Sequence, residues 1–113
     1  MSPEKWKTIP GFPEYEASTW GKIRMKQTGK ILPEHLDSKG WYRTVNITNG
    51  KRYKRAVHRL VLETFKGVRP EGSVARHLDD NQSNNRIENL EWGTPSDNQS
   101  DRRRNSAKVW YKR

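Results

Sequence analysis

The sequence has 113 residues, of which 30% are hydrophobic; five Trp, four Tyr and two Phe argue against a disordered chain, and the length limits it to one small domain. An excess of 23 Lys and Arg over 13 Asp and Glu gives a net charge of +10, which favours nucleic acid as the partner. No Cys is present, so disulfides and thiolate zinc sites are excluded, and no apolar run approaches about 18 residues, so we expect no membrane contact.

Residues 4–32 predict short strands joined by turns. Their apolar stretches are interrupted by Pro and Gly, which favours brief strands over helix. We expect strands at residues 15–18, 21–26 and 30–32, with turns at Gly21 and at Thr28-Gly29. These strands indicate a small antiparallel sheet.

Residues 41–48 and 51–57 predict a β-hairpin, because Asn49-Gly50 between two β-rich runs is typical of a two-residue turn. The hairpin is strongly basic, and its cations are either nucleic-acid contacts or solvated charges that discourage edge-to-edge pairing. The local pattern does not decide between these two. The candidate contact residues are Arg43, Lys51, Arg52, Lys54 and Arg55.

An amphipathic core helix follows the hairpin. It should end before Gly67 and Pro70. His58 lies beside its apolar stripe, where a single His is more often structural than catalytic. The stripe follows the spacing i, i+3, i+4, i+7, i+8 and consists of Val57, Leu60, Val61, Thr64 and Phe65.

Residues 73–98 predict a strand, a polar loop, a second strand and a helix. The strands are expected at 73–78 and 90–92, and the Asp and Asn side chains of the loop between them can bond neighbouring backbone groups. A long polar loop in so small a domain indicates function. Thr94 as N-cap, Pro95 at the first helical position and Asp97 three residues after the cap predict a helix from 95 to about 104.

These residues resemble the HNH nucleases of phages and phage introns, which have the ββα-metal (His-Me) finger. Residues 6–24 resemble the NUMOD-like element often joined to them. The resemblance implies an α+β fold: a β-rich, DNA-contacting element over residues 1–55, a core helix and finger over 56–104, and a basic tail over 105–113. The matching positions of the finger are His77, Asp79, Asn84, Asn85, Asn89, Leu90, Glu91, Trp92 and Asn98.

The resemblance also implies roles for individual residues. His77 is the general base that deprotonates the attacking water, and Asn89 clamps the loop through backbone hydrogen bonds. Asn98 replaces the family's final His, and its amide oxygen is expected to contact a divalent ion, Mg²⁺ or Mn²⁺. Asp79 is a candidate helper for that ion, with Asp80 as the alternative.

Arg76 departs from the family pattern, because many relatives carry a metal ligand directly before the general base. A guanidinium cannot bind a cation. Arg76 is therefore interpreted either as a clamp for a phosphate in the catalytic site or as the mark of a finger that has lost activity.

The implied activity is hydrolysis of one strand of double-stranded DNA per event by a monomer or weak dimer, with a phage partner protein as an option, in the cytoplasm of a bacterial host. A catalytically weak DNA-binding module and an RNA-binding or RNA-cleaving protein are the alternatives. Arg102 and Arg103, near the C-terminus, are expected to grip DNA, or else to belong to a solvated tail. The sequence contains no Gly-rich phosphate-binding loop, so we expect no nucleotide cofactor.

Overall fold

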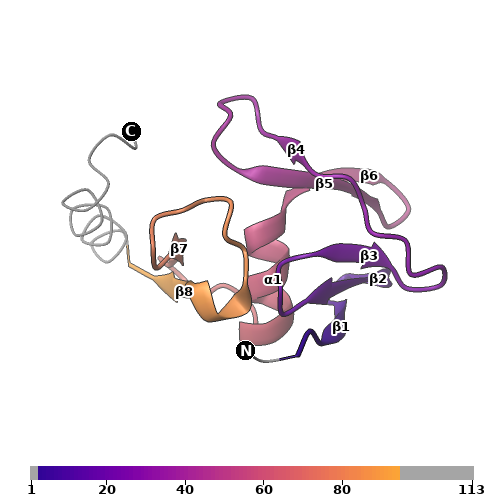
Figure 1. Ribbon diagram of the computed structural model, residues 1–113, viewed down its shortest axis with the longest axis horizontal. Helices are drawn as coiled ribbons and strands as arrows, with labels where there is room; N and C mark the ends of the chain where they lie inside the picture. The colour runs from indigo at the N-terminus through magenta and orange to yellow at the C-terminus, as the bar shows by residue number, and fades with distance from the viewer. Residues whose placement is uncertain (1–2, 95–113) are drawn as a thin grey trace.

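The computed structural model describes residues 3–94 of the chain. Over these residues, three small antiparallel sheets surround a single α-helix (Figure 1). The predicted α+β class is confirmed. Within residues 3–94 no helix is both long enough and apolar enough to cross a membrane.

The first sheet contains β1 (Trp6–Ile9), β2 (Phe12–Ser18) and β3 (Ile23–Met25) in that order. The prediction missed β1, which pairs with β2 through a turn that Gly11 makes with a φ of 80°. The strand predicted at 30–32 is reduced to one bridge between Arg24 and Ile31. Pro33 follows directly and has no N–H to continue a ladder, which explains the shortening.

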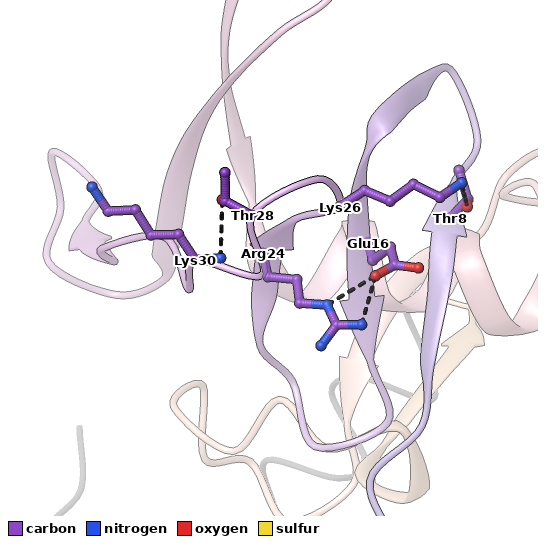
Figure 2. Close-up of polar contacts among 6 residues, drawn as sticks. All are labelled: Thr8, Glu16, Arg24, Lys26, Thr28 and Lys30. Carbon is purple, nitrogen blue, oxygen red and sulfur yellow. Dashed lines mark hydrogen bonds and ion pairs between the residues drawn. The ribbon is translucent and has the colours of Figure 1, made fainter.

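Polar contacts link the strands and the following turn of this sheet (Figure 2). Arg24 Nε donates to Glu16 Oε1 at 2.8 Å, joining β3 to β2. Lys26 Nζ donates to Thr8 Oγ1 at 2.9 Å and so reaches β1. Cross-strand pairs of this kind stabilise a sheet by about 0.2–1 kcal/mol each, so they support the register rather than determine the fold.

The second sheet contains β4 (His35–Leu36), β5 (Arg43–Thr48) and β6 (Arg52–Ala56). The hairpin predicted around Asn49-Gly50 is confirmed: Thr48 pairs with Arg52, and Gly50 has a φ of 78°. The short strand β4 was not predicted. It pairs with the start of β5 through His35 and Thr44.

Helix α1 (Val57–Lys66) begins where β6 ends and lies at the centre of the fold (Figure 1). It contacts strands of all three sheets. Its end at Gly67, with a φ of 83°, was predicted. One continuous apolar core results, made of Ile9, Tyr15, Ala17, Ile23, Val45, Ile47, Val57, Leu60, Val61, Leu62 and Leu90.

The third sheet pairs β7 (Val74–His77) with β8 (Leu90–Gly93), and a 3₁₀ turn, η1 (Ile87–Asn89), leads into β8. This strand, loop, strand order was predicted. The helix predicted from 95 to about 104 lies outside the described residues.

Candidate functional site

His77 is the last residue of β7, and its side chain is buried, with 5% of its surface exposed. Its Nε2 lies 2.8 Å from Oδ1 of Asn85. An amide oxygen only accepts hydrogen bonds, so with this geometry Nε2 carries the proton and Nδ1 carries the lone pair. A neutral imidazole held in this tautomer can accept a proton at Nδ1.

Asn89 links the two ends of the polar loop. Its Oδ1 accepts a hydrogen bond from the backbone N–H of Asp79 at 3.1 Å. Its Nδ2 donates to Oδ1 of Asp79 and to the backbone oxygen of Asn84, each at 2.9 Å. The loop therefore closes immediately beyond His77. The contribution of Asn89 to catalysis stays a prediction.

Both carboxylate oxygens of Asp79 accept hydrogen bonds from residues of the same loop. Oδ1 also accepts from the backbone N–H of Asn81 at 2.8 Å, and Oδ2 accepts from Nδ2 of Asn84 at 3.0 Å. The next residue, Asp80, is buried, has a φ of 59° and donates its N–H to the oxygen of His77 at 2.9 Å. This tight turn sets the direction in which the chain leaves His77. Asp79 as a metal ligand remains a prediction.

The rings of Tyr42, His58 and His77 pack against one another. The centroids of His58 and His77 are 5.0 Å apart, and those of Tyr42 and His58 are 4.9 Å apart. Asp37 fixes the backbone at Tyr42, because its Oδ1 accepts hydrogen bonds from the backbone N–H groups of Trp41 and Tyr42. The hydrogen bond from Trp41, chiefly, keeps the pKa of Asp37 below its usual value. Tyr42 thus joins the second sheet to the general-base candidate.

His58 is buried with 6% of its surface exposed, and its Nδ1 has no hydrogen-bond partner among the described residues. Burial, chiefly, lowers the pKa of His58 to about 3, and the neighbouring His77 and Arg59 act in the same direction. The imidazole is therefore neutral at pH 7. In this arrangement His58 fills space beside His77 rather than carrying charge.

This burial predicts a pH dependence of folding stability. In the unfolded chain His58 takes up a proton near its ordinary pKa of 6.5, whereas in the folded chain it does so only near 3. The free energy of unfolding should therefore fall as the pH drops from about 6.5 towards 3, by at most about 1.4 kcal/mol per pH unit for this one group.

His58→Leu is similar in volume and does not titrate, so its stability should fall less between pH 7 and pH 4.5 than that of the wild type. Urea unfolding at both pH values measures the difference, and carboxylates that titrate in both proteins cancel. Parallel losses in the two proteins would show that His58 is protonated equally in the folded and unfolded chains.

Arg76 lies on β7 directly opposite Glu91 of β8, and its guanidinium is 3.7 Å from the Glu91 carboxylate. Both interpretations of Arg76, as a clamp for a phosphate in the catalytic site and as the mark of a finger that has lost activity, stay predictions.

The basic hairpin borders a groove of about 650 Å³ between β6, α1 and β7. His58 forms part of its wall, so the groove leads to the imidazole that packs against His77. Of the five candidate contact residues, Lys51, Arg52, Lys54 and Arg55 are exposed and Arg43 is partly buried. The cations that line the groove are Lys54, Arg55 and Arg59.

The predicted ion ligand Asn98 and the predicted contacts Arg102 and Arg103 lie outside the described residues. Within residues 3–94, no cluster of three or more His, Asp or Glu side chains could hold a metal ion. The donors nearest His77 in sequence, Asp79 and Asp80, are oxygen ligands of the type that Mg²⁺ and Mn²⁺ prefer.

Comparison with known families decides what this site belongs to. Residues 55–100 match the HNH endonuclease family, and residues 4–48 match the NUMOD4 motif. The chain contains an HNH endonuclease domain. His77, Asn85 and Asn89 all fall inside it, and Tyr42 falls inside the NUMOD4 motif. HNH endonucleases hydrolyse phosphodiester bonds and generally use a divalent metal ion.

Relatives and a solved structure agree with this assignment. An uncharacterized HNH endonuclease of Acanthamoeba polyphaga mimivirus is 40% identical over 88 residues, which cover 78% of this chain and 26% of the relative. The H-N-H endonuclease F-TflII of Escherichia phage T5 is 33% identical over 92 residues, covering 80% of this chain and 48% of the relative.

The structure of the HNH homing endonuclease I-HmuI, solved in a study of its DNA binding and cleavage, superposes with a TM-score of 0.78 at 31% identity. The match covers 95% of this chain and 64% of I-HmuI. The chain therefore spans less than half of the curated relatives described above and about two-thirds of the solved one.

Sequence reasoning missed two features of the HNH site. Asn85 was placed in the motif without a role, although it is the hydrogen-bond partner of His77. Tyr42 was assigned only to the hairpin. The crowding of Asn residues between His77 and Asn89 signals a wired loop, but it does not tell which of them faces the imidazole.

Proposed function

We propose that this chain is a DNA endonuclease in which His77 is the general base and one divalent cation, Mg²⁺ or Mn²⁺, assists hydrolysis. The observation that carries this proposal is the buried hydrogen bond between His77 Nε2 and Asn85 Oδ1 inside an HNH domain. It leaves Nδ1 as the basic nitrogen of an oriented ring.

In the reaction, His77 Nδ1 takes a proton from a water molecule, and the water oxygen bonds to phosphorus while the bond to the leaving 3′-oxygen breaks. The leaving oxygen then takes a proton from solvent. Asn85 keeps the proton on Nε2 while the ring is neutral, and it accepts the same hydrogen bond once the ring is an imidazolium. When bound, a divalent ion would stabilise the negative charge on the phosphate oxygens. We propose Asn98 as its ligand, with Asp79 as helper.

The proposed substrate is double-stranded DNA. The exposed cations of the hairpin provide contacts to the phosphate backbone beside the groove. Arg102 and Arg103 would add to this grip. One HNH site cleaves one strand per event, so we propose nicking by a monomer or weak dimer, with or without a phage partner protein, in the cytoplasm of a bacterial host.

Supercoiled plasmid provides the test. With Mg²⁺ or Mn²⁺ the protein should convert it to open circles before any linear form accumulates, and EDTA should abolish the conversion. Direct appearance of linear plasmid would show cleavage of both strands. Intact plasmid with every metal, together with a retained gel shift, would support the DNA-binding module instead. Preferential competition by RNA would support the third alternative.

A further inference from the structure

The turn between β2 and β3, residues 19–21, packs against the polar loop of the HNH domain. The backbone N–H of Ile87 donates to the oxygen of Thr19 at 2.9 Å. The guanidinium of Arg86 lies 5.0 Å from the ring centroid of Trp20. The two segments belong to different family matches, the turn to the NUMOD4 motif and the loop to the HNH domain.

The turn is fixed from within. Ser18 is fully buried, and its Oγ accepts hydrogen bonds from the N–H groups of Trp20 and Lys22 at 3.2 and 3.1 Å. The N–H of Gly21 donates to the oxygen of Ser18 at 3.0 Å. The surface that the turn presents to the loop is therefore preorganised.

Gly21 makes the closest approach. A Cβ at this position would lie 2.5 Å from the backbone oxygen of Asn85 and 2.8 Å from its Cβ, distances that real Cβ atoms essentially never show. At each of the other six described glycines with positive φ, a Cβ would meet nothing within 4 Å. At those six positions the positive φ alone favours glycine. At Gly21 the close contact with Asn85 also excludes a side chain.

Asn85 connects Gly21 to the proposed base, because it contacts Gly21 through its backbone and His77 through its side chain. It is buried with 5% of its surface exposed, and its Oδ1 accepts the proton of His77 Nε2 at 2.8 Å. A side chain at Gly21 would push the Asn85 backbone away and lengthen or misalign this hydrogen bond. Catalytic groups are sensitive to such shifts, since a misplacement of about 1 Å can cost about 10²-fold in rate.

We propose that the turn of residues 19–21 is a positioning element for His77 that acts through Asn85. The segment that resembles a DNA-contacting element then also sets the geometry of the catalytic base. This inference rests on the proposed function, because it requires His77 to act in the reaction.

Gly21→Ala tests the proposal, with Gly29→Ala as the matched control. Gly29 has a φ of 73°, close to the 84° of Gly21, but open space around it, so the two variants share the backbone strain and differ in the contact with Asn85. We expect Gly21→Ala to lower kcat by about tenfold or more with KM within about twofold, and Gly29→Ala to leave both unchanged. Equal kcat values in the two variants would overturn the proposal.

A double-mutant cycle with Asn85→Ala separates positioning from general loosening. Once the Asn85 side chain is gone, adding Gly21→Ala should lower kcat no further. Independent, multiplying losses would contradict an action through Asn85. If Gly21→Ala does not fold, Trp20→Ala takes its place in the same cycle, and an unchanged kcat in Trp20→Ala would equally overturn the proposal.

Nuclear magnetic resonance of the imidazole N–H groups gives a readout that does not depend on cleavage. The Nε2 proton of His77 should be protected from exchange in the wild type and in Gly29→Ala, and exchange faster in Gly21→Ala. Loss of protection in a protein that cleaves no DNA would leave the positioning role standing and remove the proposed function. Unchanged protection in Gly21→Ala would remove the positioning role alone.

Discussion

His77→Ala should lower the rate of plasmid cleavage by about 10²-fold or more while DNA affinity changes little. The imidazole is buried beside Asn85, whereas the hairpin cations proposed to contact phosphate are exposed side chains, so the loss of the imidazole removes the base without removing those phosphate contacts. Cleavage of supercoiled plasmid under saturating protein, together with a gel shift in EDTA, measures the two quantities separately.

His35→Ala is the matched control. His35 is an exposed histidine on β4, so its replacement changes composition equally but leaves the site intact. Thermal unfolding of both variants shows whether His77→Ala remains folded at the assay temperature. A cleavage rate equal to that of the His35→Ala control would remove His77 from the role of general base.

Local patterns predicted the parts of this fold that local physics determines. Asn49-Gly50 specified the β5–β6 hairpin because its backbone twist matches the flanking strands. The apolar stripe predicted the ends of α1 to within a residue or two, because one face of this helix is buried against the surrounding sheets. Strand β4 carries no such signal: it has two residues, and only the neighbouring β5 makes it a strand.

The motif spacing singled out His77 and Asn89 as candidates, whose roles stay predictions, but it did not predict the contacts that support them. Tyr42 reaches the rings of His58 and His77 only because the second sheet packs on α1. Gly21 and Asn85 are distant in sequence and meet through the backbone. A turn glycine looks the same in sequence whether its surroundings are open or filled, so this contact required the three-dimensional structure.

Asn89→Ala should have the second large effect, on both stability and cleavage. It removes the acceptor of the Asp79 N–H and the donor to the oxygen of Asn84, and it leaves these loop groups without their partner. Because only 9% of the surface of Asn89 is exposed, water replaces the lost partners poorly, and we expect a loss of about 2–3 kcal/mol in the free energy of unfolding.

Cleavage by Asn89→Ala should fall by about tenfold or more even at temperatures where the protein stays folded, because the clamp closes the loop that begins directly after His77 and carries its partner Asn85. Asn46→Ala, an exposed asparagine on β5, is the control for stability. Urea unfolding and plasmid cleavage of the two variants are then compared. If Asn89→Ala loses stability but keeps the wild-type rate, the loop holds His77 without the clamp, and the positioning of the base must depend on the contact between Asn85 and the β2–β3 turn.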